Sequence, residues 1–222
     1  MLNIDSYQRI MAEWASKTIT PHVGDIKAGK GTDVTLQDQK AFNIIFVGFT
    51  EITDTFDALE FSSVLLSVAS PRSKKVSKEK YLKFVVNTYL QDVYILKERL
   101  KTYATQIKRM HDKMGRTDLT QKHIDPLFET VIGAFKGLVD TRSGHVHGKR
   151  YTDESLSDAS SMALIAEHYP EFDSHYNFSL TNAKREWKNR MENNNKETAN
   201  LLNKYFNELF KVVVDSGSVI TP

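Results

Sequence analysis

Cysteine is absent from this sequence of 222 residues. A chain without thiols has no disulfide framework, no cysteine nucleophile and no thiolate ligands for a metal. Long apolar runs are also missing, because no stretch approaches the roughly 20 residues that a membrane-spanning helix needs. The first residues lack the charged-then-apolar layout of a secretion signal. We therefore expect a soluble cytoplasmic protein that makes no membrane contact.

A large excess of charge of one sign is missing as well. The 30 Lys and Arg residues stand against 28 Asp and Glu residues, which gives a formal net charge of +2 at pH 7. This balance falls short of what a dedicated duplex-DNA binder shows, and it neither requires nor excludes RNA as a substrate. Apolar residues make up 40% and charged residues 26%, as in an ordinary globular protein. The length suits a single helical domain over residues 1–222.

Apolar side chains recur every three or four positions over most of the chain, which is the spacing of amphipathic helices. The clearest stripe consists of Phe42, Ile45, Phe49, Ile52, Phe56, Leu59 and Leu66. Helices are predicted over residues 4–17, from this stripe to about 70, and over residues 77–114, 124–140, 156–168 and 180–213. Residues 18–35 are predicted to form a loop, because they contain Pro21 and several glycines among polar residues.

Two positions within these helices call for comment. Gly48 lies in the clearest stripe, where we expect a close helix contact rather than a break. The run of asparagines at 193–195 is predicted to be a weak point of the last helix. No segment shows the sustained alternation of a strand, although the valines at 212–214 fit helix or strand. The fold class is therefore all-α, and the long stripes indicate helices packed nearly parallel in a bundle.

Cationic side chains gather directly after the predicted helix over residues 124–140. RNA can be cut without a metal when its 2′-hydroxyl attacks the neighbouring phosphorus. The reaction needs a group that accepts the hydroxyl proton, a group that protonates the leaving oxygen, and positive charge on the phosphoryl oxygens. Histidine can perform the first two tasks near neutral pH, and the planar fork of arginine matches phosphate. The residues of these types in this stretch are Arg142, His145, His147, Lys149 and Arg150.

Arg142 and His147, with four residues between them, resemble the motif of HEPN domains, in which an arginine precedes a histidine by four to six residues. In that family the motif follows a core helix of an all-α domain. The resemblance implies an up-and-down bundle of long antiparallel helices over about residues 36–215, with residues 1–35 as an appendage. It also implies a homodimer that brings two motifs together and metal-independent endoribonuclease activity that leaves a cyclic phosphate, without a cofactor.

HEPN domains often act in toxin–antitoxin or phage-defence systems, so the resemblance adds an inhibitor or antitoxin protein to the expected partners. By position, Arg142 would bind the scissile phosphate of the RNA and His147 would act as general acid or base. The auxiliary candidates are His145, Lys149 and Arg150, of which the last two would hold the flanking RNA backbone.

This sequence departs from the family pattern at the residue after the arginine, which is often asparagine and here is Ser143. Geometry adds a condition, because positions five apart on a continuous helix point about 140° away from each other. Arg142 and His147 would then not share one face. Either the chain leaves the helix near Gly144, or the partner group comes from a second subunit.

Other interpretations of the histidines remain open. Arg116 and His123, with six residues between them, also fit the family spacing, but they lie in a polar turn before a helix. We interpret His123 and His111 as structural. A zinc site is a further alternative, in which His145 and His147 supply half of the ligands. Cations after a helix C-terminus are also favoured by the helix dipole without any chemistry.

The competing function is a non-catalytic helical interaction or regulatory module. Such a module requires an exposed apolar patch, whereas a ribonuclease requires a cationic cleft that both motif residues face. The basic turn over residues 72–80 is a second place where cations gather. It either steers an RNA backbone or forms a solvated loop.

Overall fold

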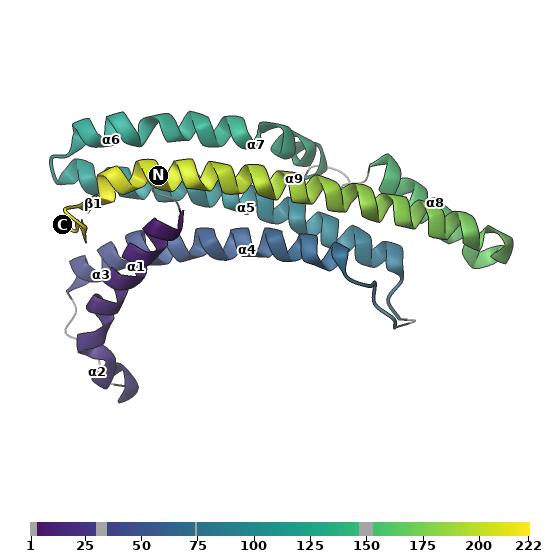
Figure 1. Cartoon of the computed structure of the whole chain (residues 1–222), viewed down its shortest axis with the longest axis horizontal. Helices are drawn as coiled ribbons and strands as arrows, with labels where there is room; N and C mark the ends of the chain where they lie inside the picture. The colour runs from purple at the N-terminus through teal and green to yellow at the C-terminus, as the bar shows by residue number, and fades with distance from the viewer. Residues whose placement is uncertain (1–3, 30–34, 74, 147–152) are drawn as a thin grey trace. The chain divides into compact units, whose positions relative to one another are not determined.

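The structure is a computed structural model of the chain that describes residues 4–29, 35–73, 75–146 and 153–222, with the side chains at 26, 36 and 137–146 not described. The all-α prediction is confirmed, because helices make up most of these residues and the sheet has only two short strands (Figure 1). The elements in chain order are α1 Ile4–Ile19, η1 Thr20–His22, α2 Val23–Lys27, α3 Leu36–Phe42, η2 Asn43–Val47, α4 Gly48–Ser67, α5 Lys78–Lys113, α6 Thr117–His123, α7 Asp125–Val146, α8 Glu154–His168, η3 Pro170–Phe172, α9 Asp173–Val213, β1 Val214–Asp215 and β2 Ser218–Val219.

The chain forms two compact units. Unit 1 consists of Met1–Asp54, Lys97–Ala134 and Thr198–Pro222, and unit 2 consists of Thr55–Leu96 and Phe135–Glu197. The unit boundaries fall within α4, α5, α7 and α9, so each of these helices contributes to both. Each unit buries an apolar core of its own. Among the helices that the structure describes, none combines the length and the apolar character that a membrane span requires.

Aromatic rings fill the core of unit 1. The ring centroid of Phe206 on α9 lies 4.9 Å from that of Tyr7 on α1 and 5.2 Å from that of Phe49 on α4. Tyr205 and Phe206 meet edge to face, which is a favoured arrangement of aromatic pairs. The buried face of α1 consists of Tyr7, Met11 and Ala15, at intervals of four residues. This cluster joins helices that are far apart in the sequence.

The helix predicted from the clearest stripe is continuous from α3 through η2 and α4, and η2 is a π-helical turn. Thr35 begins this helix, because its side chain accepts a hydrogen bond from the Asp38 amide. The close helix contact expected at Gly48 is confirmed. A Cβ atom built at Gly48 would lie 2.7 Å from Cδ2 of Tyr103 on α5, so only glycine leaves room for that ring.

The structure shows which of the valines at 212–214 are helical and which is in a strand. Val212 and Val213 end α9, and Val214 opens β1, which pairs antiparallel with β2. The two-residue turn of this hairpin has φ of 49° at Ser216 and 79° at Gly217. Positive φ at both central residues is the geometry that closes tight hairpins.

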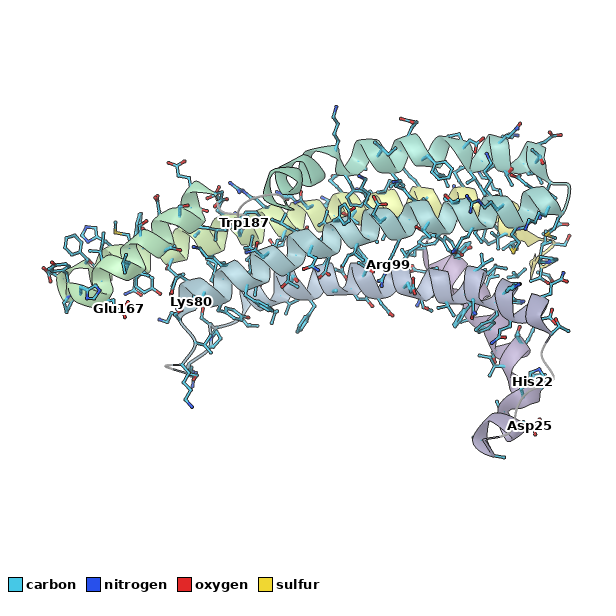
Figure 2. All side chains as sticks on the ribbon, turned by 180° about the vertical axis from the view of Figure 1, so that it is seen from behind. His22, Asp25, Lys80, Arg99, Glu167 and Trp187 are labelled. Atoms are coloured by element: carbon cyan, nitrogen blue, oxygen red, sulfur yellow. The ribbon has the colours of Figure 1, made fainter. Side chains whose placement is uncertain are left out.

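The prediction of a loop over residues 18–35 is wrong in part, because η1 and the short α2 lie within this range. Pro21 sits in the first positions of η1, where its fixed φ fits a helical turn and no backbone N–H is required. His22 and Asp25 mark this segment in Figure 2. The glycines prevented the prediction, since their low helix propensity argued against helical turns here.

In unit 2, the end of α4 and the start of α5 run antiparallel. Tyr81 Oη donates a hydrogen bond to the Leu65 carbonyl oxygen at 3.4 Å. The Asp153 side chain caps α8 by accepting from the Leu156 amide, and its other carboxylate oxygen lies 2.7 Å from Arg190 on α9. The helix predicted over residues 77–114 is α5, and its apolar residues at intervals of three and four are buried in this unit from Leu82 to Leu96.

The prediction of a weak point at residues 193–195 is wrong, because α9 continues without a break through these residues. Asn195 is buried, and its Nδ2 atom donates to the Leu59 carbonyl oxygen at 3.2 Å. Its Oδ1 atom accepts a hydrogen bond from Tyr89 Oη at 3.0 Å. The cross-helix hydrogen bonds compensate for the low helix propensity of asparagine. α9 also begins at Asp173, seven residues before the predicted start at 180.

Candidate functional site

The stretch that contains the predicted catalytic pair follows the packed part of α7. Leu127, Val131 and Phe135 form the buried stripe of this helix. The helix continues past its predicted end near residue 140 to Val146, because each further residue adds one hydrogen bond to a helix that is already formed. Arg142 and His145 therefore have helical backbone, and their side chains are outside what the structure describes.

His147, Lys149 and Arg150 also lie outside the described residues. α7 passes through Gly144 and is described as far as Val146. Both alternatives for the motif stay open, because the residues that directly follow Val146 are not described. The pairing of Arg142 with His147 stays a prediction, and so does the contribution of a second subunit.

The second pair with the motif spacing, Arg116 and His123, lies at the two ends of α6. Arg116 Nη1 donates a hydrogen bond to the Val212 carbonyl oxygen at 2.8 Å, and His123 Nδ1 lies 2.8 Å from Glu208 Oε2. Both contacts are made to the last turns of α9. They occupy the groups that would otherwise contact a phosphate, which supports a structural interpretation of both residues.

His111 is fully buried beside this pair, with its Nδ1 atom 3.1 Å from Arg116 Nη1. Burial lowers the pKa of His111 to about 4, because a charged imidazole would lose its hydration, and the nearby Arg116 charge lowers it further. The arginine donates to Nδ1, so the proton of the neutral ring is on Nε2. His111 is therefore a neutral core residue near pH 7.

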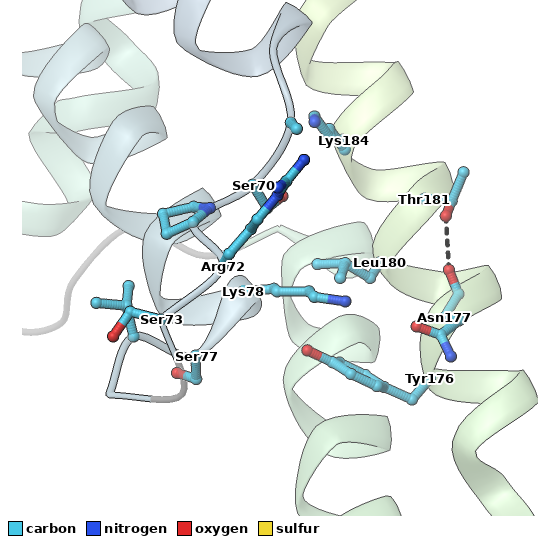
Figure 3. A pocket seen from close by; sticks show the side chains of 13 residues that line it. Ser70, Arg72, Ser73, Ser77, Lys78, Tyr176, Asn177, Leu180, Thr181 and Lys184 are labelled. Atoms are coloured by element: carbon cyan, nitrogen blue, oxygen red, sulfur yellow. Dashed lines mark hydrogen bonds between the residues drawn. The ribbon is translucent and has the colours of Figure 1, made fainter.

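A cleft of about 840 Å³ opens in unit 2 between the turn that joins α4 to α5 and the first part of α9 (Figure 3). Its described lining contains three cationic residues and no aspartate or glutamate. Most of the other lining side chains carry a hydroxyl or amide group. The lining residues are Ala69, Ser70, Pro71, Arg72, Ser73, Val76, Ser77, Lys78, Tyr176, Asn177, Leu180, Thr181 and Lys184.

The cleft is held open by contacts between α9 and both ends of the turn. Lys184 Nζ donates a hydrogen bond to the Val68 carbonyl oxygen at 2.7 Å, just after α4 ends. Tyr176 Oη donates to Glu79 Oε2 at 3.0 Å, in the first turn of α5. Burial and this bond to a carboxylate raise the pKa of Tyr176 to about 12, so its phenol stays neutral. These contacts connect α9 to both ends of the turn.

A neighbouring cleft of about 590 Å³ has a different character. Lys80 and Lys83 line it together with Glu79, Glu167 and Asp173, so cations and carboxylates alternate. Figure 2 labels Lys80 and Glu167 in this part of unit 2. Mixed charges give no preference for an anion or a cation. Of these two clefts, the acid-free cleft is therefore the one whose charges suit an anion.

Unit 2 also exposes large apolar side chains. Phe61, Val64 and Val68 follow one another at intervals of three and four residues, along and just beyond α4. Phe84 lies on the neighbouring helix α5, three residues after Tyr81, whose hydroxyl donates a hydrogen bond to the Leu65 carbonyl oxygen of α4. Phe61 is 61% exposed and Phe84 68% exposed. This apolar strip is of the kind that interaction surfaces use.

Sequence reasoning identified the basic turn of the acid-free cleft but missed the side chains that face it from α9. Lys184 and Tyr176 lie about a hundred residues further along the chain, and nothing in the local sequence links either of them to the turn. Only the overall packing of α9 brings them to the turn. Within the described ranges, no group of three or more His, Cys, Asp or Glu side chains is placed to hold a metal ion.

Comparison with known proteins adds no assignment. No protein-family model matches the chain, and neither a curated protein nor a solved structure matches it.

Proposed function

We propose that this protein is a metal-independent endoribonuclease of the HEPN type that acts as a homodimer in the cytoplasm. The observation that carries the proposal is the position of Arg142 in the last turns of α7, a helix with a buried stripe in an all-α chain. This is the setting that the resemblance to HEPN domains implies for the motif arginine. The acid-free cleft in the same unit adds support, because an RNA-cutting enzyme needs cationic surface.

In the proposed reaction, the 2′-oxygen of RNA attacks the adjacent phosphorus and the bond from phosphorus to the 5′-oxygen breaks. A histidine accepts the 2′-hydroxyl proton, and a protonated group returns a proton to the leaving 5′-oxygen. The products are a 2′,3′-cyclic phosphate and a 5′-hydroxyl. His147 is the proposed acid or base, and Arg142 stabilises the charge on the phosphoryl oxygens. His145, Lys149 and Arg150 are proposed auxiliaries.

The reaction also explains why a second subunit is proposed. On a continuous helix, residues five positions apart lie on different faces, and α7 continues past Gly144 to Val146. Groups from two α7 helices would complete each site. An enzyme of this kind damages RNA in its own cell, which is consistent with a proposed inhibitor protein in a toxin–antitoxin or phage-defence system.

The test is cleavage of mixed single-stranded and structured RNA in excess chelator. Loss of a general acid or base slows such reactions by about 10²–10⁴-fold, so His147→Ala and Arg142→Ala should each be slower by at least that lower bound. The matched control is His168→Ala, which removes an exposed histidine from α8. Sedimentation must show a dimer in the same buffer. Equal cleavage by wild type and His147→Ala would reject the assigned pair.

A second candidate function is a non-catalytic interaction module. The apolar strip of Phe61, Val64, Val68 and Phe84 favours it, because monomeric proteins rarely expose such side chains together. A second copy of this chain would cover the strip. This candidate predicts no RNA cleavage by a dimeric wild type, and it predicts that Phe61→Ser with Phe84→Ser shifts the protein to monomer. Leu164→Ser on α8, which also exposes a large apolar side chain, is the control.

A further inference from the structure

The acid-free cleft of unit 2 has the chemistry of a phosphate-binding site. Arg72 and Lys78 are exposed, and within the described part of the chain neither has a carboxylate partner within 4.0 Å. Both extend from the α4–α5 turn on the side of the cleft that faces α9 in Figure 3. Both line the same cleft, and like charges within one cleft repel one another unless an anion lies between them.

Lys184 supplies a third positive charge from the opposite side. Its ammonium group uses one of its three N–H donors on the Val68 carbonyl oxygen, so two remain for a ligand. Figure 3 shows Lys184 and the Arg72 guanidinium approaching the same end of the cleft, next to Ser70. Arginine and lysine together on both walls suit phosphate oxygens.

The neutral groups of the lining also favour a phosphate ligand. Ser77 immediately precedes α5, and its Oγ atom is shielded from solvent without a hydrogen-bond partner among the described residues. The first turn of a long helix also presents backbone N–H groups and the positive end of its dipole. Tyr176 is neutral, and its partner Glu79 lines the neighbouring cleft instead. No negative charge in the described lining opposes a phosphate.

The size of the cleft limits what enters it. A volume of about 840 Å³ lies in the range of ligand pockets, so a short stretch of one strand fits, whereas a duplex would contact only the rim. Cations that line an open groove bind successive phosphates of such a strand.

We propose that the cleft formed by Arg72, Lys78 and Lys184 binds the phosphodiester backbone of single-stranded RNA. The choice of RNA as the source of the phosphates rests on the proposed ribonuclease function. The described lining of the cleft contains no motif residue, so its proposed role is to hold the strand and not to take part in the cleavage step.

The experiment measures equilibrium binding of a fluorescent single-stranded RNA by anisotropy, in chelator, to the full chain with His147→Ala as background. Arg72→Gln with Lys78→Gln removes two cleft cations. Lys75→Gln with Lys80→Gln is the matched control, because it removes the same charge from the same turn without touching the cleft lining. Circular dichroism and thermal unfolding confirm that both variants are folded.

We expect the cleft variant to bind about 10-fold more weakly than its background and the control to change by less than about 2-fold. Because each phosphate contact contributes about 0.7 to the slope of log K against log salt for single strands, the cleft variant should lower that slope by about 1.4. Lys184→Gln should lower it by a further 0.7, roughly. Duplex RNA should show a smaller difference between the two variants.

Equal weakening by cleft and control variants would overturn the proposal, because binding would then depend on charge alone. Failure of the background protein to bind any RNA would overturn it too. A third outcome is that inorganic phosphate raises the unfolding temperature of the background protein, the cleft variant abolishes this effect, and no RNA binds. The cleft would then be assigned to a small anion instead. Cleavage is measured separately with the His147 codon restored, so a protein that binds RNA through the cleft without cutting it would reject the proposed function alone.

Discussion

The hydroxyl oxygens of Tyr7 and Tyr103 lie 2.8 Å apart in the buried core of unit 1. Tyr103 Oη also donates a hydrogen bond to the Ile45 carbonyl oxygen at 3.0 Å. Each phenol has one proton, so the Tyr103 proton goes to the carbonyl and Tyr7 donates to Tyr103. Burial raises the pKa of both phenols, which keeps them neutral donors at all physiological pH values.

This order of donors predicts unequal effects of two similar substitutions. Tyr7→Phe removes one donor and leaves Tyr103 paired with Ile45, so it should lower the free energy of unfolding by about 1 kcal/mol. Tyr103→Phe leaves both the Tyr7 hydroxyl and the Ile45 carbonyl without this partner in a dry core, so it should cost about 2–3 kcal/mol. Urea unfolding measures both values. Equal costs would show that the proton order is different.

The contact of Gly48 with the ring of Tyr103 gives a second prediction. A Cβ at Gly48 would lie 2.7 Å from Tyr103 Cδ2, and that ring is fixed by its hydroxyl. Gly48→Ala should therefore lower the free energy of unfolding by about 1–3 kcal/mol, despite the better helix propensity of alanine.

The control for this prediction is Gly133→Ala in α7. A Cβ at Gly133 meets no atom within 4 Å, so alanine should raise the stability by about 0.5–1 kcal/mol. Opposite signs at two helical glycines, measured by thermal or urea unfolding, would establish the packing explanation. Stabilisation at both positions would contradict it.

The sequence was sufficient to predict most helices, because burial of one helix face imposes a three-to-four spacing that is readable without coordinates. The stripe from Ile45 to Leu66 is buried except at the half-buried Phe56, and the apolar stripe of α5 is buried from Leu82 to Met110. Position 48 was interpretable for the same reason, since a glycine within such a stripe costs stability unless a neighbour needs the space. Boundaries were less accurate, as the longer α7 and α9 show.

Features that depend on two distant segments were not predictable. The pairing of Asn195 with Tyr89 requires the register of α9 against α5, which no local pattern encodes. Lys184 faces the basic turn for the same reason. The candidate catalytic pair is the reverse case, because Arg142 and His147 were identified by their types and spacing alone, and their pairing remains a prediction.

Asn195 gives a third prediction, because it connects Tyr89 on α5 and Leu59 on α4 in the core of unit 2. Asn195→Leu leaves the buried Tyr89 hydroxyl without its acceptor and should cost about 2–3 kcal/mol in the free energy of unfolding. Combining it with Tyr89→Phe should cost less than the sum of the two single changes, because the stranded hydroxyl is then gone. Additive costs in this cycle would mean that the two side chains are not coupled.

The buried imidazole of His111 predicts how stability depends on pH. Its pKa is about 4 in the folded chain against 6.5 for the free side chain, so between these values the unfolded chain binds a proton that the folded chain does not. Acid therefore favours unfolding, and the stabilisation by neutral His111 is complete above pH 6.5 and lost as the pH falls toward 4. At about 1.4 kcal/mol per pH unit, the loss between pH 7 and pH 5 should be about 2 kcal/mol.

Urea unfolding at pH 7, 6 and 5 measures this dependence. His111→Gln cannot titrate, so its stability should be lower at pH 7 but should fall less steeply with acid than that of the wild type. His168→Gln, which removes an exposed histidine from α8, is the control for the loss of a histidine as such. A His111→Gln slope as steep as that of the wild type would mean that other groups take up the proton, and that burial does not hold the imidazole in its neutral form.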